Sequence, residues 1–184
     1  LGKWEKSKFM GTELFGKALG MIGCGNIGSL VAERGIGLKM KVIVYDPFVS
    51  EEHLQKIGAK KVELKEIFQS ADFITLHTPL TNETKGILNK KTMLECKKGV
   101  RIINCARGGL IVEEDLLELL EESHIAGAAL DVFDEEPPKN QHLFKSENLI
   151  LTPHLGASTK EAQENVAIQI AQQISDFLLN DVIV

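Results

Sequence analysis

Three side chains in the second half of the sequence could together act on a small organic acid: Arg107 in NCARGG, Glu136 in LDVFDEEPP and His154 in TPHLGAST. An arginine guanidinium binds a carboxylate through two parallel hydrogen bonds. A histidine exchanges protons near neutral pH and can remove the proton of a hydroxyl group. A neighbouring carboxylate orients such an imidazole and stabilises its charged form. These residue types therefore predict acid–base chemistry on a molecule that carries a carboxylate and a hydroxyl group.

Each of the three residues also has an ordinary structural explanation. Arg107 could be solvated in a loop, Glu136 before two prolines could be an exposed turn residue, and His154 could be a buried structural histidine. Their positions favour the functional interpretation, because each one follows an apolar run that predicts a β-strand. The carboxyl ends of parallel strands meet at one edge of a sheet, where such sheets bind their ligands. We therefore expect the three residues to share one catalytic site.

A glycine-rich turn, GCGNIG, follows the first apolar run and predicts a dinucleotide-binding loop. Gly23 would permit a tight turn, Gly25 would let the backbone approach a pyrophosphate, and Gly28 would let a helix pack closely on a strand. The free N–H groups of Asn26 and Ile27 would hold the phosphates without a basic side chain. S-adenosylmethionine-dependent methyltransferases also place a glycine-rich turn after their first strand, so the downstream residues decide between the two ligands.

Asp46 stands 18 residues after Gly28, at the end of the run KVIVYD. A carboxylate at this position accepts hydrogen bonds from the 2′-hydroxyl of a ribose and would repel a 2′-phosphate. The sequence therefore predicts NAD, rather than NADP, as the cofactor. An aspartate before a proline can also start a turn, and that structural role is compatible with ribose binding.

The chain alternates short apolar runs, rich in β-branched residues, with stretches of helical pattern. The runs predict strands over residues 19–22, 42–45, 73–76, 101–104, 126–130 and 149–151, with a weaker strand near Val62. Helices are predicted over residues 27–34, 51–57, 64–69, 90–95 and 112–122. Strands that alternate with helices imply βαβ units. We therefore predict an α/β fold with a doubly wound parallel sheet of the Rossmann type.

A further helix is predicted near the end of the chain. Ser158 and Glu161 have the spacing of a capping box, with the serine as N-cap. Apolar residues then recur at steps of mostly four and line one face of the helix. They are Ala162, Val166, Ile170, Ile174, Phe177 and Leu178.

The composition is that of one ordinary globular domain, with 184 residues, 21 basic and 26 acidic side chains and a net charge of −5. No basic surplus is available to neutralise phosphates, which argues against a nucleic-acid partner. No run of about 18 apolar residues occurs, which argues against a membrane span. No cluster of histidine, cysteine and acidic residues has the spacing of a metal site. The three cysteines contain no CxxC pair and suit a reducing compartment, so we expect a cytoplasmic protein.

The sequence resembles the D-isomer-specific 2-hydroxyacid dehydrogenase family in four stretches: GTELFGKALGMIGCGNIG, VRIINCARGGL, AGAALDVFDEEPP and TPHLGASTKEAQ. The likeness covers essentially the whole chain, and the arginine, glutamate and histidine signatures of the family appear in order. By this resemblance, Arg107 would bind the carboxylate and carbonyl of the substrate. His154 would be the acid–base residue, with Glu136 beside it.

The resemblance also implies which residues contact NAD. Some lie in the glycine loop and the others follow later strands. Cofactor contacts are expected from Gly23, Gly25, Asn26, Ile27, Gly28, Asp46, Thr78, Cys105, Ala106, Arg107, Asp131, His154, Leu155, Gly156 and Ala157. Cys105 is expected to act as a small residue beside the cofactor and not as a nucleophile.

Within the family, the sequence most resembles the members that oxidise 3-phospho-D-glycerate to 3-phosphooxypyruvate at the head of serine synthesis. The expected partners are NAD, 3-phosphoglycerate and further copies of the chain in a homodimer or higher homo-oligomer. We expect residues 1–184 to form the NAD-binding domain of a longer enzyme, without its substrate-binding domain, so that the isolated chain is inactive. The alternatives are another D-2-hydroxyacid dehydrogenase and an NAD-responsive corepressor of the same fold.

Overall fold

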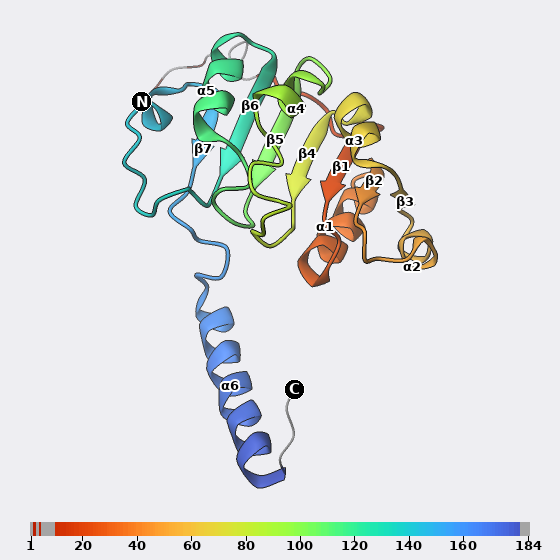
Figure 1. Ribbon diagram of the computed structural model, residues 1–184, viewed down its shortest axis with the longest axis vertical. Helices are drawn as coiled ribbons and strands as arrows, with labels where there is room; N and C mark the ends of the chain where they lie inside the picture. The colour runs from red at the N-terminus through yellow and green to blue at the C-terminus, as the bar shows by residue number, and fades with distance from the viewer. Residues whose placement is uncertain (1, 3, 5–9, 181–184) are drawn as a thin grey trace.

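The computed structural model describes residues 2, 4 and 10–180, and its central feature is a seven-stranded parallel sheet (Figure 1). The strands are β1 (Ala18–Ile22), β2 (Lys41–Tyr45), β3 (Lys60–Lys61), β4 (Phe73–Leu76), β5 (Val100–Asn104), β6 (Ile125–Leu130) and β7 (Leu149–Leu151). The helices are α1 (Asn26–Gly37), α2 (Glu51–Lys56), α3 (Leu64–Ser70), α4 (Lys90–Leu94), α5 (Glu113–Glu121), the 3₁₀-helix η2 (Leu143–Lys145) and α6 (Lys160–Asn180).

The strand order is β3-β2-β1-β4-β5-β6-β7, and every neighbouring pair is parallel. The predicted doubly wound sheet is therefore confirmed, as are the predicted strands. The order reverses between β1 and β4, so the chain runs outward from this point in both directions. In such sheets the crevice at the carboxyl ends of the two strands is the usual ligand site.

Two apolar clusters lie on opposite faces of the sheet. Met21 and Val44 pack with α1 and α2 on one face, whereas Ile22 and Ile102 pack with α3, α4 and α5 on the other. Adjacent residues of β1 thus enter different clusters, as expected for strands that are buried on both sides. The layers hold the carboxyl ends of β1, β4, β5 and β6 along one edge.

Helix α1 begins one residue before the predicted helix and ends three residues after it, because it continues through Gly35 to Gly37. Glycine weakens a helical pattern in sequence, since it is a poor helix former. Here it is required by packing: a Cβ atom on Gly35 would lie 2.8 Å from Leu19 Cδ2 of β1. Close approach of α1 to the sheet therefore offsets the low helix propensity.

Helix α6 extends away from the sheet and has no buried residue (Figure 1). Its predicted apolar residues recur with helical spacing, but Val166, Ile170 and Ile174 keep 50%, 50% and 54% of their surface exposed. The predicted N-cap is wrong by one residue: the hydroxyl of Thr159, not Ser158, accepts the Ala162 N–H at 3.1 Å. Among the described residues, no helix has the length and apolar character needed to cross a membrane.

Candidate active site

The glycine loop joins β1 to α1 and explains two of its glycines by contact. Gly23 has a φ angle of +92°, and a Cβ atom there would lie 2.5 Å from the carbonyl oxygen of His77. A Cβ atom on Gly28 would lie 2.8 Å from the carbonyl oxygen of Gly23. Both positions therefore require glycine, as the sequence predicts for a tight turn and a close helix.

The middle of the loop faces open space. A Cβ atom on Gly25 would meet no atom within 4 Å, and no side chain caps α1 where it starts at Asn26. The first turn of α1 also holds no acidic residue. The uncapped N–H groups of Asn26 and Ile27 and the positive end of the helix dipole therefore favour an anion in front of Gly25.

Asp46 follows β2 and lies buried beside this loop. Its carboxylate accepts hydrogen bonds from the N–H groups of Cys24 at 2.8 Å, Phe48 at 2.8 Å and Val49 at 3.1 Å. Asp46 therefore does start a turn, and it also ties that turn to the glycine loop. Its predicted contact with a ribose is compatible with this position and stays a prediction.

Two cavities adjoin along the carboxyl edge of the sheet and share the residues Gly25, His77, Thr78 and Pro79. The larger, of 570 Å³, runs from Gly25 past Asp46 and Phe48, and its lining is mainly apolar. The smaller, of 280 Å³, runs from the glycine loop to Arg107. The predicted cofactor residues that line the smaller cavity are Gly25, Asn26, Ile27, Gly28, Thr78, Cys105, Ala106 and Arg107.

The groove formed by these cavities fits a dinucleotide. The hydroxyl of Thr78 is buried without a hydrogen-bond partner among the described residues, and a buried polar group of this kind usually awaits a ligand or water. The open space at Gly25 suits a pyrophosphate, and the apolar cavity beyond Asp46 suits an adenine ring. The residues present thus fit NAD.

Arg107 lies in the loop after β5, and the buried side chain of Asn104 shapes that loop. Asn104 Nδ2 donates to the carbonyl oxygen of Arg107 at 2.9 Å, while Asn104 Oδ1 accepts the Ala106 N–H at 3.0 Å. The guanidinium of Arg107 donates to the carbonyl oxygen of Ala106 at 2.6 Å. Sequence reasoning missed Asn104, although its place at the last position of a strand before CARGG was a usable signal.

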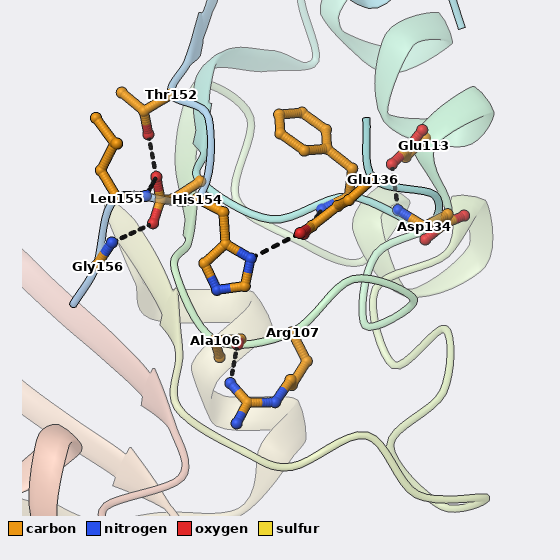
Figure 2. A network of polar contacts seen from close by, with 11 residues as sticks. Ala106, Arg107, Glu113, Asp134, Glu136, Thr152, His154, Leu155 and Gly156 are labelled. Carbon is orange, nitrogen blue, oxygen red and sulfur yellow. Dashed lines mark hydrogen bonds and ion pairs between the residues drawn. The ribbon is translucent and has the colours of Figure 1, made fainter. Parts of the chain in front are cut away.

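His154 and Glu136 form a hydrogen-bonded pair, with 2.7 Å between Nδ1 and Oε2 (Figure 2). The other carboxylate oxygen of Glu136 accepts the Phe133 N–H at 3.2 Å. The bonds from His154 and Phe133 lower the pKa of Glu136, so its carboxylate is charged at neutral pH. Figure 2 shows the second ring nitrogen of His154 on the side where Arg107 lies. Of the three predicted catalytic residues, the structure pairs His154 with Glu136, and Arg107 lies on a loop that is bonded to the Glu136 loop through Gly109 and Asp134.

Asp131, at the end of β6, holds the loop that carries His154. Its buried carboxylate accepts bonds from the Thr152 hydroxyl, the Leu155 N–H at 2.8 Å and the Gly156 N–H at 2.9 Å (Figure 2). Burial alone would raise the pKa of Asp131, but these hydrogen bonds and the nearby His154 lower it. The carboxylate therefore stays charged and fixes the loop.

Five of the predicted cofactor contacts line neither of the two cavities: Asp131, His154, Leu155, Gly156 and Ala157. Asp131 is buried, whereas Leu155, Gly156 and Ala157 are exposed. Cys105 does line the smaller cavity, and partial burial together with the Asp131 carboxylate raises the pKa of its thiol. A thiol that stays protonated suits a packing role beside the cofactor. Among residues 2, 4 and 10–180, no three histidine, cysteine or acidic side chains are grouped so that they could hold a metal ion.

Comparison with known proteins identifies the family. Residues 1–156 match the NAD-binding domain of the D-isomer-specific 2-hydroxyacid dehydrogenases. The chain therefore belongs to this family, and NAD is its cofactor.

Curated relatives narrow the comparison further. The chain is 54% identical to D-3-phosphoglycerate dehydrogenase of Bacillus subtilis over 175 residues, which are 95% of this chain and 33% of that protein. It is 53% identical to the human protein of the same name over 177 residues, which are 96% of this chain and 33% of that protein. The chain thus spans about a third of the length of these relatives.

Solved structures agree with the family and the fold. A glyoxylate reductase from Paecilomyes thermophila has a TM-score of 0.90 and 31% identity, with 95% of this chain and 53% of that chain covered. The NAD complex of a D-isomer-specific 2-hydroxyacid dehydrogenase from Lactobacillus delbrueckii has a TM-score of 0.84 and 31% identity, with 94% and 56% covered. The likeness extends to a protein that was solved with this cofactor.

Proposed function

We propose that this chain is the NAD-binding domain of an oxidoreductase that converts 3-phospho-D-glycerate into 3-phosphooxypyruvate, the first step of serine biosynthesis. The observation that carries the reaction class is the His154–Glu136 pair beside Arg107, at one end of a dinucleotide groove. The choice of substrate rests on the names of relatives that are more than half identical to the chain.

The reaction separates into a proton and a hydride that leave the same alcohol. Arg107 holds the carboxylate of the substrate, with its guanidinium offering two parallel N–H donors. His154 takes the proton of the C2 hydroxyl, and the charged Glu136 stabilises the imidazolium that results. When bound, NAD would supply the acceptor for the hydride on C2, so that the alcohol becomes a 2-oxo acid. In the reverse direction His154 returns the proton to the carbonyl oxygen.

The cofactor residues act in three groups. Asp46 accepts hydrogen bonds from the adenosine ribose, and the N–H groups of Asn26 and Ile27 hold the pyrophosphate. Thr78 lies where the two cavities adjoin, and Cys105 lines the smaller cavity. The remaining contacts come from Gly23, Gly25, Gly28, Ala106, Arg107, Asp131 and the segment His154, Leu155, Gly156 and Ala157.

The assembly around this domain is also proposed. Residues 1–184 act as one NAD-binding domain, and a substrate-binding domain completes the enzyme. A homodimer or higher homo-oligomer is supported by large apolar side chains exposed near the start of the chain: Trp4 at 93%, with Met10 and Phe15. A reducing compartment such as the cytoplasm is supported by the free thiols of all three cysteines.

A substrate panel on the full-length enzyme with NAD tests the proposal. We expect NADH formation with 3-phospho-D-glycerate and little with the L isomers of simple 2-hydroxy acids. Faster turnover of glycolate or D-lactate would instead indicate another D-2-hydroxyacid dehydrogenase, a class supported by the glyoxylate reductase likeness. NADH binding without turnover of any acid would indicate a corepressor-like protein. The Arg107→Ala and His154→Ala variants serve as controls for contaminating enzyme.

A further inference from the structure

Glu113 is a buried carboxylate that the reaction described above does not use. It begins α5, whose first turn also contains Glu114 and Asp115, yet Glu113 is only 8% exposed. Acidic residues at a helix start are favoured by the helix dipole whether or not they are buried. Burying one is costly unless it is hydrogen-bonded. The position of Glu113 therefore needs an explanation beyond the helix itself.

The carboxylate of Glu113 holds the loop that carries Glu136. Its Oε1 accepts the Asp134 N–H at 2.9 Å (Figure 2). Burial raises the pKa of Glu113; the bond from Asp134 opposes this shift, and the nearby carboxylates of Asp134 and Glu114 add to it. The hydrogen bond from the Asp134 N–H therefore holds the buried carboxyl group of Glu113 in place.

Asp134 extends the same link to the loop that carries Arg107. Its Oδ1 accepts the Gly109 N–H at 2.7 Å. The two loops are pressed together at this point, because a Cβ atom on Gly108 would lie 1.7 Å from the carbonyl oxygen of Phe133. Phe133 in turn donates its N–H to Glu136. One chain of contacts thus runs from α5 through Asp134 to both catalytic loops.

We propose that Glu113 and Asp134 are positioning residues that set Arg107 relative to the His154–Glu136 pair. Glu136 lies two residues after Asp134, and Arg107 lies two residues before Gly109, so a displacement of either contact moves a catalytic side chain. Small displacements matter, since misplacing a reacting group by about 1 Å can cost about a hundredfold in rate. This inference rests on the proposed oxidation of a 2-hydroxy acid.

Three variants of the full-length enzyme test the role. Glu113→Ala should lower kcat for oxidation by about tenfold or more, with the dissociation constant of NADH unchanged. The acidic limb of its pH profile of kcat/KM should move to lower pH, as we expect for Glu136→Gln, because the carboxylate of Glu136 is displaced from His154. Glu113→Gln should restore most of the rate, since its amide oxygen can still accept the Asp134 N–H. The exposed neighbour variant Glu114→Ala should match the wild type.

Two results would overturn the positioning role. One is a Glu113→Ala enzyme that is merely less heat-stable, with kcat and the acidic limb of the wild type. The other is rapid hydrogen–deuterium exchange of residues 131–136 in the wild-type enzyme, equal to that in Glu113→Ala. The exchange measurement does not depend on substrate. An inactive wild-type enzyme that shows slow exchange, lost on Glu113→Ala, would therefore contradict the proposed function and leave the contact between the loops established.

Discussion

The bond between His154 Nδ1 and Glu136 Oε2 determines which imidazole nitrogen can serve a substrate. Because Nδ1 is occupied, Nε2 is the atom that can take a hydroxyl proton. The bond also lowers the pKa of Glu136, so a negative charge stays beside the ring throughout the working range of pH. The pair therefore favours the imidazolium that forms when the alcohol is oxidised.

Replacing Glu136 with glutamine tests this pairing in the full-length enzyme. Glutamine keeps the shape and removes the charge, so the imidazole loses its proton more easily. The acidic limb of kcat/KM for oxidation should move to lower pH. His154→Ala should reduce the rate about 10²–10⁴-fold. Arg107→Ala should weaken substrate capture with little movement of the limb. If the acidic limb stays at its wild-type pH in Glu136→Gln and shifts in Arg107→Ala, these roles are wrongly assigned.

Asp46 is expected to set the preference between the two nicotinamide cofactors. Its carboxylate would accept ribose hydroxyl groups and repel a 2′-phosphate. Asp46→Ala should therefore lower the ratio of the NADPH dissociation constant to the NADH dissociation constant, measured by fluorescence titration. Asp46 also accepts three backbone N–H groups, so the variant should melt at a lower temperature. An unchanged ratio in a folded variant would exclude the role in cofactor choice.

Residue types and order were enough to select Arg107, Glu136, His154 and Asp46 as candidates, because each carries chemistry that few residues can supply. The hydrogen bonds that fix the loops of these residues were not predictable in the same way. Asn104 and Asp131 work by accepting or donating hydrogen bonds to backbone groups of loops, and such contacts depend on how the loops close. A sequence does not display that closure.

At the scale of elements, each of the six predicted strand ranges agrees with the observed strand to within one residue at either end. The reason is that burial on both faces of the sheet gives a strand a continuous apolar run. The ends of helices were harder. Gly35 and Gly37 hide the last turn of α1, which exists because α1 packs against β1. Thr159 and Ser158 are both good N-caps, so only the backbone of the loop after His154 selects between them.

Asp72, the residue before β4, links three segments of the chain and makes the stability of the fold depend on pH. Asp72 accepts the Ala18 N–H at 2.9 Å and the Lys97 ammonium at 2.6 Å. Burial would raise the pKa of Asp72, but Lys97, Ala18 and the charge of Lys17 lower it. A carboxyl whose pKa falls on folding stabilises the protein above its unfolded pKa of about 3.9, and this contribution is lost as pH falls through the folded value.

Asp72→Asn should therefore lower the free energy of unfolding at pH 7 by about 1–2 kcal/mol, and the melting temperature by about 2–6 °C. Near pH 3 the difference between variant and wild type should shrink. Thermal melts followed by circular dichroism at the two pH values measure this. Glu33→Gln, on the exposed face of α1, is the matched control and should change neither melt. A larger difference at pH 3 than at pH 7 would contradict the sign.

At the scale of the whole molecule, the chain presents a cofactor groove and the proposed catalytic side chains along one edge of a sheet. It spans about a third of the curated relatives it matches. The sequence pattern correctly gives α6 an apolar face, but a pattern cannot say what lies against that face. In this structure Phe177 is 51% exposed, and its neighbours Leu178 and Leu179 are 72% and 78% exposed.

The isolated chain should bind the cofactor and yet oxidise no substrate at an appreciable rate. Arg107, Glu136 and His154 are all present, but 2-hydroxy acid would be neither positioned between them nor shielded from water. NADH formation from 3-phospho-D-glycerate, followed by absorbance, checks this on chain purified free of host enzyme. The full-length enzyme at equal concentration is the positive control. Comparable rates from the two would show that no further domain is needed.

The central claim is that residues 1–184 form a complete NAD site by themselves, and one calorimetric titration tests it most directly. Purified chain is titrated with NADH and, separately, with NADPH under the same conditions. We predict saturable one-to-one binding of NADH and much weaker binding of NADPH, because the glycine loop, Thr78 and Asp46 are all within the chain. Equal affinity for the two cofactors, or no binding of NADH to folded chain, would contradict the account.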